Sequence, residues 1–167
     1  MAGAVARALI LLFGVASLVS RASGQSAPPA KVSASLRRVF AAGARADTLV
    51  IGSDSVLRVT RGDSLLGYAV VRNVKGKDQP ITFLVAMDAG DRLKDVDILV
   101  YRESYGGEVA YEAWRRQFRG KSASDPLQVG RDIHTISGAT ISVNAVTLGV
   151  RRALAQLVEW HRSGALR

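Results

Sequence analysis

Apolar residues fall into short runs between residues 48 and 101, and turn-forming residues separate the runs. The runs are rich in Val, Ile and Leu, and the segments between them, such as Gly-Ser-Asp at residues 52–54, are typical of tight turns. Closely spaced strands joined by polar turns favour hairpins, and therefore an antiparallel sheet. Five strands are predicted, at Thr48–Ile51, Val56–Thr60, Leu66–Val74, Ile81–Met87 and Asp95–Tyr101.

One of these runs, Ile81–Met87, is apolar on both faces. A strand of this kind is covered on both sides of its sheet, whereas a strand with one wet face alternates between apolar and polar residues. We therefore expect this strand to lie in the centre of the sheet, with helices or loops on either side. Tyr68 is expected in the core as well.

Helical periodicity appears in three places. Val32–Ala42 carries Leu36, Val39 and Phe40 on one side, and Glu108–Phe118 carries an apolar set that includes Trp114. The clearest pattern is in the last 25 or so residues, where the predicted inward positions are Val146, Val150, Ala153, Leu154, Leu157 and Val158. Strands flanked by helices, without regular alternation, indicate an α+β fold. Its antiparallel sheet is packed by an N-terminal helix, a middle helix and a C-terminal amphipathic helix.

The first 24 residues have the pattern of an export signal. Residues 1–7 carry one arginine and no acid, residues 8–19 are mostly apolar, and Ala22 and Gly24 form a small-residue cleavage site. A membrane span needs about 20 apolar residues, which is more than this run provides. An uncleaved signal anchor remains the alternative. This signal predicts a periplasmic or extracytoplasmic location. Residues 25–31, which are rich in Pro and Ala, are predicted to form a linker, and the length of the remainder suits a single domain at residues 32–162.

Composition excludes several kinds of chemistry. The chain has no Cys, which rules out a disulfide scaffold, an iron–sulfur cluster and a Cys nucleophile. Its two histidines, His134 and His161, are far apart in sequence, so no metal site is expected. The formal charge of +9 would by itself suggest nucleic acid. An exported basic protein instead meets anionic lipid head groups and acidic proteins, so no nucleic-acid partner is predicted. A solvated basic surface with no specific partner is the alternative.

Hydroxyl side chains are concentrated just before the last helix. Ser137, Thr140 and Ser142 lie within six residues, and Gly138 permits a positive φ. The first amides of a helix have no backbone partner, and the helix dipole is positive there, so such an end can hold a phosphate. The residues alone leave two interpretations: a phosphate site, or simple N-capping by Ser137 or Thr140.

The sequence Ser-Gly-Ala-Thr-Ile-Ser at residues 137–142 resembles the flavinylation motif of the FMN-binding domain family. That family includes the flavin-carrying subunits of sodium-translocating NADH:quinone reductase and of Rnf complexes, and the periplasmic domain of NosR. The resemblance extends over residues 66–158. It implies that a flavin transferase, using FAD, esterifies the phosphate of FMN to Thr140. Ser137, Gly138, Ala139 and Ser142 would then be further cofactor-binding residues.

A second segment supports the same resemblance. Glu-Ser-Tyr-Gly-Gly-Glu at residues 103–108 takes the place of the family's Glu-Thr-Pro-Gly segment, although it lacks the proline. The resemblance implies that this loop faces the flavin, with Glu103, Tyr105, Gly106 and Gly107 as contacts and Tyr105 stacked on the ring. Taken without the family, the segment is an ordinary turn.

The motif departs from the family at one position. His134 stands three residues before Ser137, where the family usually has Asp, and Asp132 lies two positions too early. A histidine at this place accepts a hydrogen bond when neutral and attracts the flavin phosphates when protonated. His134 is therefore a candidate cofactor contact, and a purely structural role is the alternative.

These observations predict an exported flavoprotein that carries FMN as an electron carrier in a membrane-associated redox chain. The expected partners are a flavin transferase for maturation and a membrane redox complex or quinone-linked protein. No acid–base pair accompanies the motif, which favours electron transfer over stand-alone catalysis. Two alternatives remain: a non-redox accessory protein with a degenerate motif, and a protein that binds FMN reversibly.

Overall fold

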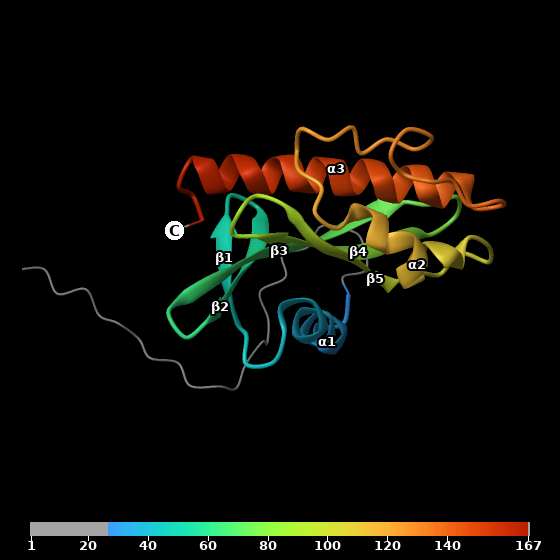
Figure 1. Ribbon diagram of the computed structural model, residues 1–167. Helices are drawn as coiled ribbons and strands as arrows, with labels where there is room; N and C mark the ends of the chain where they lie inside the picture. The colour runs from blue at the N-terminus through green and yellow to red at the C-terminus, as the bar shows by residue number, and fades with distance from the viewer. Residues whose placement is uncertain (1–26, 167) are drawn as a thin grey trace, which may run out of the picture.

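A single antiparallel sheet forms the centre of the molecule in the computed structural model, which describes residues 27–166 (Figure 1). Its five strands follow one another in space in the order of the chain, and each neighbouring pair is antiparallel. The strands are β1 (Arg45–Ile51), β2 (Asp54–Arg61), β3 (Ser64–Lys75), β4 (Pro80–Asp88) and β5 (Leu93–Val100). All five predicted strands are confirmed, and most extend one to three residues beyond the predicted ends.

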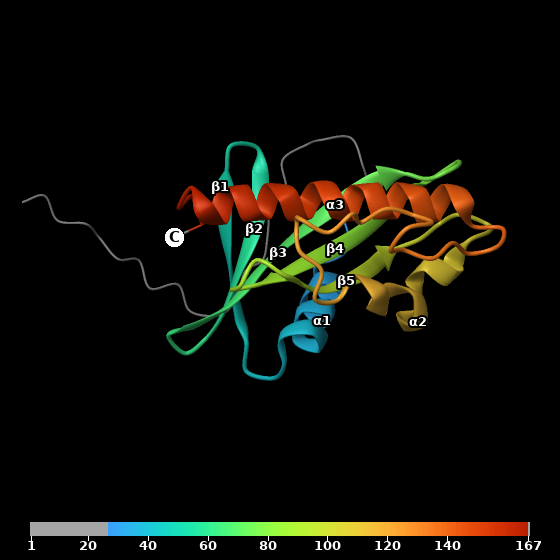
Figure 2. The ribbon, with the colours of Figure 1, turned by 45° about the horizontal axis from the view of Figure 1, so that its top comes forward.

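Helices cover both faces of this sheet. The 23-residue helix α3 (Thr140–Arg162) runs along one face, and α1 (Pro29–Phe40) lies against the other (Figures 1 and 2). Beyond β5 lies a chain of short turns, made of η1 (Gly107–Ala110), α2 (Glu112–Arg115) and η2 (Arg116–Phe118). The arrangement is the predicted α+β fold.

The prediction that both faces of β4 are covered is confirmed, since every residue from Ile81 to Met87 is buried. The strand is not the middle one of the sheet, because it lies between β3 and the edge strand β5. Its side chains alternate between two cores. Phe83 and Val85 pack in the cluster under α3, whereas Leu84 and Ala86 pack in the cluster under α1. All six positions predicted to face inward on α3 are buried, and so is Tyr68.

A glycine sets how closely α3 approaches the sheet. A Cβ placed on Gly149 would lie 2.6 Å from Phe83 Cζ and 2.6 Å from Val74 Cγ1, closer than such atoms can come. The helix can therefore lie on β3 and β4 at this depth only because residue 149 has no side chain.

The predicted middle helix over Glu108–Phe118 is present, but it is broken into the three short pieces η1, α2 and η2. Tyr111 has an extended backbone (φ −71°, ψ 137°) that separates η1 from α2. Val109 and Trp114 are both buried, yet five residues of continuous helix would turn their side chains about 140° apart. The break at Tyr111 lets both reach the core. The N-terminal helix is confirmed, but it begins at Pro29, where a proline suits the first turn.

The predicted signal peptide, residues 1–24, lies outside the described residues. Between residues 27 and 166, no helix combines the length and the apolar character needed to cross a bilayer.

Candidate cofactor site at the N-terminus of α3

Helix α3 begins at Thr140 with an alanine, Ala139, at the N-cap position. Among the described residues no side chain makes a capping hydrogen bond there, so the predicted alternative of a cap by Ser137 or Thr140 is wrong. Both hydroxyl residues are exposed instead. Alanine is a poor N-cap residue, and a helix start without a side-chain cap keeps its outward amides and positive dipole available for an anion.

A tight turn leads the chain into this helix. Gly138 has φ +79°, and the amide of Ala139 donates to the carbonyl of Ile136 at 3.0 Å. A Cβ on Gly138 would meet no atom within 4 Å, so the turn lies on the surface. Ala139 is buried, at 3% exposed, and anchors the turn from beneath.

The loop after β5 packs directly against this start of α3. The hydroxyl of Tyr101 lies 2.8 Å from Ser142 Oγ and donates to the carbonyl of Tyr105. Gly106 has φ +85°, and a Cβ there would lie 2.7 Å from the Tyr101 hydroxyl and 3.2 Å from Ala139 Cβ. The two segments singled out from the sequence are therefore in contact, and only a glycine fits between them.

The residues of that loop point in different directions. Tyr105 is 81% exposed, and Gly107 is half-buried beside the ring of Tyr101. The carboxylate of Glu103 accepts hydrogen bonds from the amides of Asp78 (2.9 Å) and Gln79 (3.1 Å) in the β3–β4 turn, and these bonds lower the pKa of Glu103. Glu103 is thus tied to the neighbouring turn, where it fixes the loop.

The backbone of His134 is held while its side chain is exposed. Its amide donates to Gln117 Oε1 at 2.7 Å, and its carbonyl accepts from Trp114 Nε1 at 2.9 Å. Asp132 accepts from the amides of Leu127 and Gln128.

Asp132 also pairs with Lys121 at 3.0 Å. Burial alone would raise the pKa of Asp132, but the hydrogen bonds and the lysine outweigh it and lower that pKa. The Asp132 carboxylate is therefore used within its own loop.

An open pocket of about 450 Å³ lies between this loop and the α2 segment. Trp114 is 7% exposed and packs edge-on against Phe118, so it is a core residue as predicted. It is also one wall of the pocket, which sequence reasoning missed. The lining residues are Ala113, Trp114, Arg116, Gln117 and His134.

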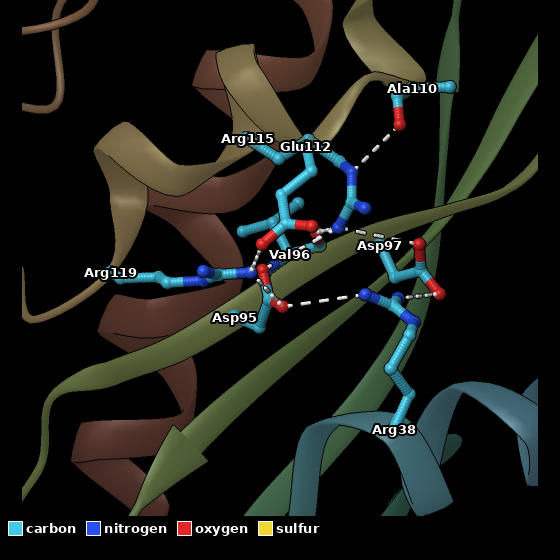
Figure 3. A network of polar contacts seen from close by, with 8 residues as sticks. All are labelled: Arg38, Asp95, Val96, Asp97, Ala110, Glu112, Arg115 and Arg119. Atoms are coloured by element: carbon cyan, nitrogen blue, oxygen red, sulfur yellow. Dashed lines mark hydrogen bonds and ion pairs between the residues drawn. The ribbon is translucent and has the colours of Figure 1, made fainter.

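A network of ion pairs holds the α2 segment in place (Figure 3). Arg115, only 6% exposed, lies 3.5 Å from Asp95 and 3.4 Å from Asp97 on β5, and donates to the Val96 carbonyl. The remaining members are Arg38 on α1, paired with Asp97, and Arg119, which joins Asp95 to Glu112. Three arginines and three acids balance, so each buried charge has a partner.

The network therefore fixes the segment that carries Trp114 and Gln117 against β5, and with it one wall of the pocket. Sequence reasoning missed it because its members come from separate parts of the chain.

The part of the chain that holds this site is similar to known proteins. Residues 76–155 match the family model described as the FMN-binding domain. The chain is also 32% identical over 105 residues to a subunit of the proton-translocating ferredoxin:NAD(+) oxidoreductase complex of Clostridium ljungdahlii. That alignment covers 58% of this chain and 56% of the relative, so the chain spans about half the length of the curated protein it matches. The family match includes both the loop after β5 and the turn into α3.

Proposed function

We propose, from the match of residues 76–155 to the FMN-binding domain model, that the protein uses FMN as its cofactor, carries it covalently on Thr140 and relays electrons in a membrane-associated redox complex. The observation that carries the proposal is the start of α3, where an exposed Thr140 opens a helix with no side-chain cap. When bound, FMN supplies one- and two-electron chemistry, and the protein positions it.

The residues at this site suit such a group. The first amides of α3 and the hydroxyl of Ser137 are available to the phosphate, and Gly106 leaves the turn at Ala139 uncrowded. The nearby pocket offers an aromatic wall at Trp114 for a flat apolar ring. His134, Gln117 and Arg116 around it offer polar contacts. The exposed ring of Tyr105 is a further candidate for stacking.

Attachment needs outside help, because a threonine hydroxyl is a weak nucleophile. In the proposed reaction, Thr140 Oγ attacks the phosphorus on the FMN side of FAD. The new P–O ester bond forms as the anhydride P–O bond breaks, AMP leaves, and the hydroxyl proton passes to a base of the flavin transferase. The chain's contribution is an exposed, positioned hydroxyl next to helix amides that favour the negative phosphate.

Two features support an extracytoplasmic role beside a membrane complex. The relative is by name a subunit of a proton-translocating complex, and the first 24 residues have the pattern of an export signal. We therefore propose a membrane redox complex or a quinone-linked protein as the electron partner. Fractionation of expressing cells tests the location. The flavin-loaded protein should be found in the periplasmic or membrane fraction.

Intact mass spectrometry of Thr140→Ala tests the attachment. The full chain is expressed with a flavin transferase, and the wild type should carry a flavin-sized mass addition that survives denaturation. Thr140→Ala should carry none, and its free energy of unfolding should change by less than about 0.5 kcal/mol, since Thr140 makes no cap.

Ser137→Ala is the matched control, because it removes a neighbouring exposed hydroxyl, and it should remain mostly loaded. Flavin that leaves the wild type on denaturation would favour the reversible binder, and a wild type without flavin would favour the accessory protein. A mass addition that persists on Thr140→Ala would place the bond elsewhere.

A further inference from the structure

Ser142 is the hydroxyl residue of the motif that the structure places differently from the other two. It is 5% exposed, whereas Ser137 and Thr140 are both exposed. Its Oγ lies 2.8 Å from the hydroxyl of Tyr101, a residue 41 positions earlier that the sequence motif does not include. This pairing joins the end of β5 to the first turn of α3.

The protons of this pair can be assigned from their partners. A phenol has one proton, and Tyr101 donates it to the carbonyl of Tyr105. Tyr101 must then accept from Ser142, so the serine proton points at the phenol. Burial raises the pKa of Tyr101, the bond with Ser142 lowers it, and Glu103 and Glu108 raise it again. The net rise keeps the phenol protonated at neutral pH, which preserves this chain of hydrogen bonds.

The chain of bonds ends in the loop after β5. Glu103 is held by the β3–β4 turn, Tyr105 is held through its carbonyl, and Gly106 lies against the Tyr101 hydroxyl and Ser142 Oγ. The loop is therefore fixed from both sides, and it covers Ser142 while it leaves Thr140 uncovered.

We propose that Tyr101 is a positioning residue for flavin attachment. By accepting a hydrogen bond from the Ser142 hydroxyl, it holds the loop at residues 103–107 against α3, so that Thr140 is the hydroxyl that the first turn of the helix presents to the transferase. This rests on the proposed attachment to Thr140. Ser142 then holds the loop in place through its hydrogen bond to Tyr101, and it is neither a phosphate ligand nor a second attachment point for flavin.

The test measures flavin attachment to purified unloaded full-length protein by a flavin transferase with FAD. Tyr101→Phe and Ser142→Ala each remove one end of the bond, and each should raise the KM for the protein roughly tenfold, the factor that one ordinary hydrogen bond supplies. The kcat should change less. Because Tyr101→Phe already removes the bond that Ser142→Ala breaks, the double variant should be no slower than Tyr101→Phe alone.

Tyr68→Phe is the matched control. Tyr68 is a buried tyrosine whose hydroxyl donates to the Leu166 carbonyl at 3.1 Å, near the opposite end of α3. Its removal should lower stability as much as Tyr101→Phe does, yet leave the attachment kinetics unchanged. Amide hydrogen exchange gives a readout independent of flavin, and residues 103–107 and 140–143 should exchange faster in Tyr101→Phe than in Tyr68→Phe.

Each outcome bears on one claim. Normal attachment kinetics in Tyr101→Phe, or equal slowing in Tyr68→Phe, would overturn the role of Tyr101 and leave Thr140 attachment standing. A flavin found on Ser142 in Thr140→Ala would also overturn the role of Tyr101, because a buried serine hydroxyl that is hydrogen-bonded to Tyr101 is not available for attachment. Failure of the wild type to accept flavin would instead overturn the proposed function itself.

Discussion

The two ends of α3 are built in opposite ways. At the C-terminal end the chain folds back through hydrogen bonds from Ser163 to the Glu159 carbonyl (2.9 Å) and from Ala165 to the Trp160 carbonyl (2.9 Å). Leu166 is fully buried there. At the N-terminal end an alanine occupies the cap, and Thr140 and Ile141 are exposed.

Ion pairs add to the contrast. Asp91, in the β4–β5 turn, lies 2.6 Å from His161 Nδ1 and 3.2 Å from Arg162 Nε, so the last turn of α3 is tied to the sheet by charge as well as by packing. A cation near a helix C-terminus also suits the negative end of the dipole. The comparison indicates that stability is concentrated at the C-terminal end, which lets the N-terminal end keep its amides for a ligand.

The largest expected effect comes from deleting buried volume at the C-terminal end. Leu166→Ala should lower the free energy of unfolding by about 2–4 kcal/mol, because Leu166 is fully buried in the cluster under α3. Ile141→Ala, a similar truncation at 51% exposure, should cost less than about 0.5 kcal/mol. Urea unfolding measures the free energy of unfolding of both variants. An equal loss in Leu166→Ala and Ile141→Ala would contradict the contrast between the two ends of α3.

A smaller effect is expected from a glycine pair at the N-terminal end. Gly106→Ala combines φ +85° with a Cβ 2.7 Å from the Tyr101 hydroxyl, and should cost about 2 kcal/mol and reduce flavin loading. Gly138→Ala meets open space at φ +79°, so it should cost only about 1 kcal/mol from the backbone. Thermal unfolding and intact mass are the measurements. If Gly138→Ala loses as much stability and flavin loading as Gly106→Ala, the contact between residue 106 and Tyr101 is unimportant.

The smallest effect concerns the Asp91 ion pairs. Burial alone would raise the pKa of Asp91, but hydrogen bonds and charges from His161 and Arg162 outweigh it and lower that pKa below its ordinary value. A lowered carboxyl pKa stabilises the fold above the pKa of the unfolded chain, about 3.9, and this stabilisation is lost as the pH falls through the folded-state pKa. Asp91→Asn should therefore cost about 1 kcal/mol or less at pH 7.

The difference between Asp91→Asn and the wild type should begin to shrink below about pH 4, where the Asp91 carboxylate of the unfolded chain becomes protonated, and should be lost as the pH falls through the lowered pKa of the folded state. Urea unfolding at pH 7 and in steps below pH 4 gives the comparison. A difference that stays constant over this range would mean that the charge of Asp91 is not what ties this end.

The strands, the buried centre of β4 and the inward face of α3 were predictable because each depends on a short-range period in the sequence. The motif at residues 137–142 was found for a similar reason, since its residues are contiguous. The middle helix was predicted but its break at Tyr111 was not, because nothing in the local apolar pattern around Val109 and Trp114 marks an interruption.

Long-range polar pairs could not be predicted. The bond between Tyr101 and Ser142 joins residues 41 apart, and the bonds of Glu103 to the β3–β4 turn span 24 and 25 residues. Nothing in the local pattern marks a tyrosine or a glutamate as the partner of a distant group. The buried Arg115 is a similar case, because a charged residue is expected outside until its acids, Asp95 and Asp97, are known to be nearby.

The simple order of the sheet has a consequence for how the chain matures during synthesis. Strands that follow one another in space can pair as they emerge from the ribosome, because each new strand needs only the one before it. The face that holds Phe83 and Val85, however, is covered by α3, which follows all five strands in the chain. A growing chain therefore exposes an apolar sheet face from the time the strands pair until α3 is available, and this is the interval in which a chaperone has most to protect.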